Sequence, residues 1–534
     1  MASSHVASDA RPASHSGLMR LPRGAMRWMG CAIAMAVLLG AGVYFADAHW
    51  PYRYRIVKPL LEGVLGSQLQ IASYHRTYFP HPGFVASGIT LRRKSAPDLP
   101  PLGSADALVV QGRWSDLLLL RERVALVDIT ALHIVVPALG SRANREDFPP
   151  GSASDFSGPD TLIDDLKIHR GLLDIMRPNG KRFSYPIMEL DIRNFQKGRT
   201  NTYTVTMQNA LPWGIIQSHG SFGPLNAQNL GQTPVAGRFS FSSVKLGDVG
   251  DIRGTLNSSG QFRGRLAAME AAASSETPDF AVGRGVPTPV YGEVHCTVNG
   301  LSGEVALKQV EAKSGETTVV ASGGIIGTPK IANIDVSVMK GRTQDLLRPF
   351  VHDNVPISGP IWLRAHAYVG PGGNGAGLLQ RLYVQGAFDV PAERATNRAT
   401  EKSLSDFSQR AQKNKAGSGN HDSAQNESTD ALSSLQGPAE IRNGIASSPH
   451  LTFHIAGAQA SLKGTFNFHD ESAHLTGNLA MQSDISHAVT GFKSVLLKPL
   501  DPFMKKRKAG AVIPIAITGG PGHYKISQDF SHLK

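Results

Sequence analysis

The stretch LTFHIAGAQASLKGTFNFHDESAHLTGNLAM, residues 451–481, decides the fold class of this chain. Apolar side chains recur in it at alternate positions of each run, and the members are Leu451, Phe453, Ile455, Leu462, Phe466, Phe468, Leu475 and Leu479. Side chains two apart lie on the same face of a β-strand, whereas one face of a helix repeats every three or four residues. The acidic pair Asp470-Glu471 falls where a hairpin turn is needed. The stretch therefore predicts successive strands with one apolar and one polar face.

The same alternation recurs through most of the chain beyond Pro51. Further apolar positions of this kind are Phe239, Phe241, Val294, Val319, Ile325, Ile334 and Val336. Helical spacing is scarce, and we expect it at residues 57–69 and 114–120. Gly171 is expected to mark a turn between strands at 166–169 and 172–176. Strands joined without intervening helices favour antiparallel pairing.

A sheet of more than about fifteen strands must curl, split into two layers or form a trough. The predicted fold class is all-β: one long, curled antiparallel sheet with an N-terminal transmembrane helix and a few short helices. Residues 392–436 interrupt the pattern, because they are polar and rich in Ser, Asn, Lys and Glu. We interpret them as a helical or disordered insertion between strands.

The N-terminal region contains one long apolar segment, WMGCAIAMAVLLGAGVYFA, at residues 28–46. As a helix it is about 28 Å long, which matches the hydrocarbon thickness of a bilayer. Residues 1–27 carry four arginines and a single acid, Asp9, so this tail is predicted to be cytoplasmic and residues 52–534 to lie on the far side of the membrane. The alternative is a signal peptide cleaved near Ala46-Asp47-Ala48. Both interpretations export most of the chain.

Composition and motifs exclude several functional classes. The formal net charge is +12, but the basic residues are dispersed and form no nucleic-acid-binding motif, so nucleic acid is not an expected partner. The two cysteines, Cys31 and Cys296, are not expected to pair. His450 and His454 are too widely spaced for a zinc site, so no metal or other cofactor is predicted. No nucleophile–base pattern indicates catalysis.

The order of several motifs resembles AsmA-like envelope proteins, particularly their C-terminal region. These motifs include LPWGIIQSHGSFGPLN at 211–226, VYGEVHCTVNGLSGEVALKQVEA at 290–312 and KSVLLKPLDPFMKKRKAGAVIPIAITGGPGHYKISQDF at 493–530. The similarity covers roughly residue 56 to the C-terminus. It implies a single-pass inner-membrane protein of diderm bacteria with a periplasmic β-trough, related to bridge-like lipid-transfer proteins. It also implies roles in phospholipid traffic and outer-membrane biogenesis and integrity.

The apolar strand faces are the candidate site. If two sheets close on each other, these faces form a dry core, whereas in an open trough they line a groove for acyl chains. With the resemblance we favour the trough. The candidate groove residues are Phe239, Phe241, Val294, Val319, Ile325, Ile334, Val336, Phe453, Ile455, Leu462, Phe466, Phe468, Leu475 and Leu479. Lys505, Lys506, Arg507 and Lys508 are candidates for attracting anionic lipid head groups.

The leading hypothesis is therefore a non-enzymatic protein, anchored in the inner membrane, that handles or transports phospholipid between the inner and outer membranes. The expected partners are phospholipids, the membrane and envelope proteins. The alternative is an assembly factor for outer-membrane proteins that acts through exposed strand edges.

Overall fold

A computed structural model describes the chain at residues 50–65, 67–93, 98–138, 141–143, 161–176, 180, 182–196, 198–226, 229–327, 331–352, 355, 357–371, 376–395, 433–455, 458–481, 512–520 and 524–528. The chain forms two compact units, Met1–Leu61 and Glu62–Lys534. The sheet and the candidate site belong to the second unit.

The first described element is a helix, α2 (Tyr54–Leu65). It lies close to the helix expected at residues 57–69 but begins three residues earlier. It also ends earlier, because strand β1 already starts at Gln68. Within the described residues, no helix combines the length and the apolar character that a membrane crossing requires. Residues 28–46, the predicted anchor, lie outside the described residues.

The second unit is predominantly β-sheet, as the alternation predicted. Its first strands are β1 (Gln68–Thr77), β2 (Gly83–Arg92), β3 (Gly103–Gln111), β4 (Arg123–Thr130), β5 (His133–Val136), β6 (Leu162–Met176), β7 (Arg182–Phe195), β8 (Asn201–Asn209) and β9 (Gly214–Phe222). The middle strands are β10 (Pro234–Lys245), β11 (Ile252–Arg253), β12 (Thr255–Arg265), β13 (Ala268–Val282), β14 (Thr288–Val298), β15 (Val305–Ser314), β16 (Thr317–Ile326) and β17 (Ile331–Arg342). The last are β18 (Ile357–Ser358), β19 (Pro360–Val369), β20 (Leu382–Ala395), β21 (Ser433–Arg442), β22 (Ile445–Ile455), β23 (Ala458–Asn467), β24 (Ser472–Met481), β25 (Val512–Gly519) and β26 (Lys525–Gln528).

Short helical elements occupy a few of the connections. They are α3 (Trp114–Leu118), α5 (Thr343–Leu347), α6 (Leu378–Arg381) and the 3-10 turns η1 (Leu230–Gln232), η2 (Leu246–Val249) and η3 (Arg348–Phe350). The position of α3 agrees with the helical turn expected at 114–120.

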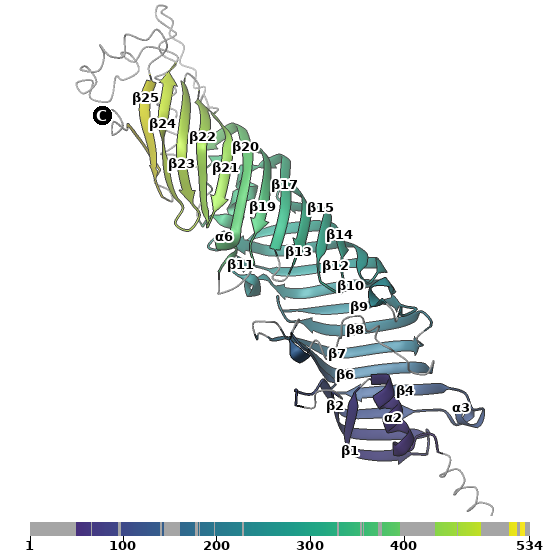
Figure 1. Cartoon of the computed structure of the whole chain (residues 1–534). Helices are drawn as coiled ribbons and strands as arrows, with labels where there is room; N and C mark the ends of the chain where they lie inside the picture. The colour runs from purple at the N-terminus through teal and green to yellow at the C-terminus, as the bar shows by residue number, and fades with distance from the viewer. Residues whose placement is uncertain are drawn as a thin grey trace, which may run out of the picture. The chain divides into compact units, whose positions relative to one another are not determined.

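Most strands pair with the next strand in the chain in one large sheet (Figure 1), and the sheet passes the two-residue strands β11 and β18, because β10 pairs with β12 and β17 with β19. Most pairings are antiparallel, as predicted, but β6 pairs parallel with both β4 and β5. The sheet is therefore mixed. The connection from β5 to β6, residues 137–161, has the length that a parallel crossover requires.

The expected turn at Gly171 is wrong. Residues 162–176 form one continuous strand, β6, that pairs with β7 along its whole length. The strand kinks at Arg170, whose φ is 54°, and the line formed by β4 and β5 kinks beside it at Ala131, with φ 53°. The Ala131 amide donates to the His169 carbonyl at 2.8 Å, so the two kinks are matched and the ladder continues past them.

The polar segment 392–436 lies between the paired strands β20 and β21. Residues 392–395 belong to β20 and residues 433–436 to β21, so strand structure extends further into this segment than predicted. The remainder of the predicted insertion lies outside the described residues.

Candidate functional site

The register of the strands joins apolar residues into one row across the sheet. Directly paired residues lie on the same face, and the row runs from β2 to β25. Its members, here called the apolar row, are Phe84, Val110, Val127, Leu166, Ile192, Tyr203, Gly220, Gly237, Phe262, Ala271, Cys296, Leu307, Gly323, Ile334, Ala367, Val384, Ile441, Ala446, Phe466, Ala473 and Gly519. None of these side chains is charged.

The opposite face of the same strands is polar. One row on it, displaced by one residue from the apolar row, consists of Ser322, Asp335, His366, Gln385, Glu440, Ser447, Thr465, His474 and Thr518. His366 contacts Asp335 at 2.8 Å and Asn333 at 2.9 Å through its two ring nitrogens. This face, here called the polar face, presents side chains that water solvates well.

Burial varies along the apolar row. Phe84 and Val110 at one end and Ala473 near the other are buried. The members from Val127 to Phe466 are half-buried, apart from the exposed Gly323. A second sheet packed on this face would bury them as a core. The middle of the apolar face therefore retains accessible surface.

Near the C-terminal end, apolar side chains on the same face pack into a buried cluster. Leu451, Ala460, Leu462, Leu479 and Ile515 form it, and Phe388, Leu435, Phe453, Leu475 and Ile517 pack against it. The candidate residues Leu462 and Leu479 thus have almost no accessible surface.

The other sequence-predicted residues lie on the apolar face at different places. Ile334 and Phe466 are members of the apolar row, and Phe239, Val294 and Val336 lie in the next row, joined through Gly260, Ala273, Val310 and Ala321. Phe241, Val319 and Ile325 are two residues from members of these rows, and Phe468 packs its ring 5.2 Å from that of Phe466. Ile455 ends β22. Lys505, Lys506, Arg507 and Lys508 lie outside the described residues.

Sequence reasoning missed several members of the row, among them Tyr203, Phe262 and Leu307. Phe262 follows the alternation of β12, but small residues dominate that strand and weaken the pattern. Gly237 explains how the aromatic rings fit. A Cβ there would lie 2.9 Å from both the Phe262 ring and the Tyr203 hydroxyl, so both side chains lie over a position that needs glycine. Burial raises the pKa of Tyr203, although its hydrogen bond with Ser218 opposes this.

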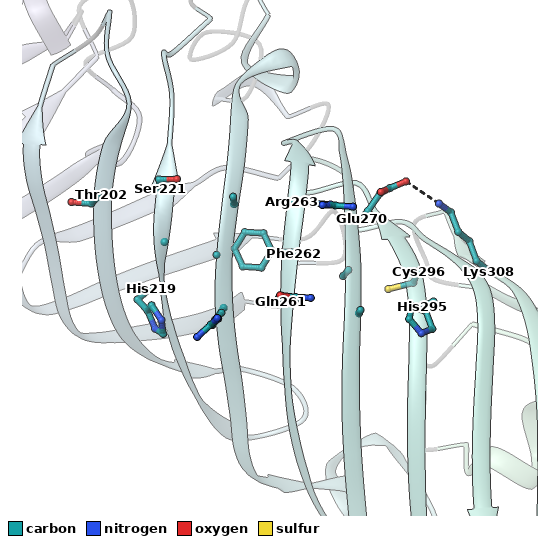
Figure 2. A pocket seen from close by; sticks show the side chains of 16 residues that line it. Thr202, His219, Ser221, Gln261, Phe262, Arg263, Glu270, His295, Cys296 and Lys308 are labelled. Carbon is teal, nitrogen blue, oxygen red and sulfur yellow. Dashed lines mark hydrogen bonds and ion pairs between the residues drawn. The ribbon is translucent and has the colours of Figure 1, made fainter.

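A shallow hollow of about 790 Å³ spans β8 to β15, and most of its lining side chains belong to the polar face (Figure 2). Lys308 donates to Glu270 across it at 3.1 Å. This hydrogen bond and the lysine charge lower the pKa of Glu270. His295 and Cys296 both line the hollow, but consecutive strand residues point to opposite faces, so they do not form a cysteine–histidine catalytic pair.

A buried carboxylate lies at the junction of β5, β6 and β7. Asp174 is 1% exposed and accepts hydrogen bonds from Ser184 at 2.6 Å and from His133 at 2.8 Å. Burial alone would raise its pKa, but these bonds and the Arg182 charge outweigh burial and lower it. Serine and histidine both point at the carboxylate, so the arrangement differs from a catalytic triad, in which histidine contacts the serine. It holds three strands together.

Two long-range contacts join opposite ends of the strands. The loops 246–254, 283–287 and 343–352 lie at one end and are called rim A, whereas 299–304, 376–381 and 468–471 lie at the other and are called rim B. Asp251 of rim A accepts a hydrogen bond from the Leu378 amide of rim B. Glu471 of rim B accepts one from the His352 amide of rim A. Strands of about ten residues would hold the rims about 30 Å apart in a flat sheet.

A metal-binding site would need several ligating side chains close together. No group of three or more His, Cys, Asp or Glu side chains there could hold a metal ion.

No family model and no curated protein matches this chain. The geometry of the apolar face is therefore the basis for the function proposed below.

Proposed function

We propose that this chain is a non-enzymatic envelope protein that holds phospholipid acyl chains on its apolar face and handles phospholipid between the inner and outer membranes. The observation that carries the proposal is the apolar row, which continues through successive strands without a charged member and stays half-buried along its middle. Burying each CH₂ group of an acyl chain contributes about 0.8 kcal/mol. A continuous apolar surface supplies such burial at every strand.

The rim contacts favour a groove rather than a flat sheet. When Asp251 meets Leu378 and Glu471 meets His352, the sheet between them has to twist and roll. The two faces of one strand differ in exposure: Val294 is half-buried, whereas the next residue, His295, is exposed. The head groups would remain in water along the opening.

The location of this activity rests on the N-terminal segment. If residues 28–46 span the inner membrane, the sheet follows directly after the anchor and lies in the periplasm. The chain would then receive lipid at the membrane in which it is anchored and contribute to outer-membrane integrity.

The decisive experiment places a charge on the apolar face and compares it with the same charge on the polar face. Val294→Asp adds a carboxylate between Ala273 and Val310, whereas His295→Asp adds one to the exposed side of the same strand. The full chain is purified from cells, and bound phospholipid is quantified by mass spectrometry. We expect V294D to retain at least roughly tenfold less phospholipid than H295D, because an acyl chain cannot solvate a charge.

Circular dichroism and unfolding midpoints establish that both variants remain folded. A folded V294D chain that carries as much phospholipid as H295D contradicts the proposal. A wild-type chain without phospholipid also contradicts it and gives precedence to the assembly-factor hypothesis, in which charges on the apolar face are tolerated.

A further inference from the structure

Two turns meet at one end of the N-terminal strands. The first, residues 78–82, joins β1 to β2, and the second, residues 112–122, joins β3 to β4 and contains α3. Gly83 pairs with Gln111, and the Gly112 amide donates to the Pro82 carbonyl at 2.7 Å. This hydrogen bond fixes the two turns beside each other, and Figure 1 shows α3 projecting past β4.

These turns expose large apolar side chains at their tips. Phe79 is 90% exposed and Leu120 is 91% exposed, and Tyr78, Trp114, Leu118 and Leu119 are also exposed. A surface leucine alone needs no explanation, but several large apolar residues grouped on adjacent turns mark an interaction surface. We call Tyr78, Phe79, Trp114, Leu118, Leu119 and Leu120 the apolar tip.

The fold holds these leucines outward. Asp116 is buried, and its backbone carbonyl accepts a hydrogen bond from the Arg121 amide at 2.8 Å, which closes the loop behind α3. Leu120 adopts a left-handed conformation with φ 51°. The loop thus turns back directly after a run of four leucines and leaves the last three, Leu118, Leu119 and Leu120, exposed.

Around the tip, arginine side chains are exposed and the carboxylates that pair with them are buried. Arg113 pairs with Asp164 at 2.9 Å and Arg121 lies 3.8 Å from Asp116, and in both pairs the arginine is exposed while the carboxylate is buried. Arg76 places its guanidinium 5.8 Å from the Tyr78 ring. Glu122 is an exposed acid in the second turn. Outward-facing guanidinium groups beside Trp, Tyr, Phe and Leu are the combination found at the interface of an anionic bilayer.

The apolar segment that the sequence predicts to span a membrane lies close to this surface in the chain. The apolar segment 28–46 ends shortly before β1, and residues 47–67 are the whole connection between them. We propose that the apolar tip inserts into the interface of the anionic bilayer that holds the segment 28–46, so that the N-terminal end of the sheet opens onto the membrane. This inference rests on the proposed function for its membrane, but its test uses a different readout.

The test places an environment-sensitive fluorophore on the tip. In a Cys31→Ser, Cys296→Ala background, Leu119→Cys is labelled with nitrobenzoxadiazole and the full chain is incorporated into phosphatidylethanolamine–phosphatidylglycerol vesicles. Leu301→Cys is the matched control, because Leu301 is 60% exposed and Leu119 is 61% exposed. We expect the label at 119 to emit at shorter wavelength than the label at 301 and to be quenched by spin-labelled lipid.

Adding Leu118→Ser and Leu120→Ser to the labelled chain is expected to return the emission at 119 to that of label in water. If the label at 119 behaves like the label at 301, or if the chain does not float with the vesicles, the proposal is overturned and the tip becomes a surface for a protein partner. Because phospholipid carried on the apolar face is measured separately, failure of this test leaves the V294D comparison intact.

Discussion

At the scale of single residues, the buried charge at Asp174 shows how the sheet tolerates a carboxylate between strands. Its carboxylate lies among β5, β6 and β7, and the Ser184 hydroxyl, the His133 ring and the Arg182 guanidinium all approach it. A buried carboxylate is tolerated when hydrogen bonds and positive charge replace the water it loses. Its pKa is accordingly lowered.

Because the pKa of Asp174 is lowered, we expect the stability lost on substituting this residue to depend on pH. A carboxylate with a lowered folded pKa stabilises the fold fully above its ordinary value of about 3.9, and this stabilisation disappears as the pH falls through the folded value. Asp174→Asn is expected to reduce the free energy of unfolding by about 1–3 kcal/mol at neutral pH. Urea unfolding of both proteins at pH 7 and pH 3 measures the difference. The difference in the free energy of unfolding between the two proteins should be smaller at pH 3 than at pH 7. An equal difference at both pH values would contradict a stabilising role for the Asp174 charge.

Which face a residue occupies was predictable from the sequence, because alternation alone sets it. Ile334 and Val336 were expected on the same face, and the register places them there. Which residues become neighbours was not predictable. Irregularities such as the register shift between Val338 and Gly341 displace a pairing by one residue, and no local pattern specifies them.

At the scale of elements, the sequence predicted most strands but not the kinked strand β6. A glycine within an apolar run indicates a turn in isolation, yet Gly171 lies inside the ladder, with Ile168 and Ile187 each 3.2 Å from where its Cβ would be. Tertiary packing thus overrides the local turn signal. The parallel pairing of β6 was also missed, because the crossover from β5 contains no predicted helix.

The rim contacts predict coupling between elements that are distant in the chain. Asp251→Ala leaves the Leu378 amide without its acceptor, and we expect the α6 segment to lose about 1–3 kcal/mol of local stability. Hydrogen exchange should accelerate in residues 376–381 and in 246–253. Asp248→Ala is the matched control, because Asp248 in the same loop accepts from the Trp213 amide at 2.7 Å and should affect residues 211–213 instead. Unchanged exchange at 376–381 in D251A would contradict a stabilising contact between Asp251 and the α6 segment.

At the scale of the whole second unit, the proposed function depends on the apolar row being continuous from strand to strand. A short apolar patch would bind one ligand in one place, whereas a row that passes through successive strands offers similar contacts at every step. The buried cluster around Leu451, Leu462 and Leu479 interrupts the accessible surface near the C-terminal end. The accessible part of the apolar row therefore extends from β4 to β23.

Continuity can be tested with photo-crosslinking at separated points of the apolar row. Benzoylphenylalanine replaces Phe262, Ile334 or Phe466 in the full chain, and the controls Arg263, Asp335 and Thr465 lie one residue away on the polar face of the same strands. If acyl chains occupy the whole accessible row, all three apolar positions should form phospholipid adducts in cells and the controls should not, because a strand separates its two faces. Mass spectrometry of the adducts supplies the measurement. Adducts confined to one position would replace the continuous track with a local pocket, and equal adducts at the controls would show that the label reports the bilayer around the chain instead of the groove.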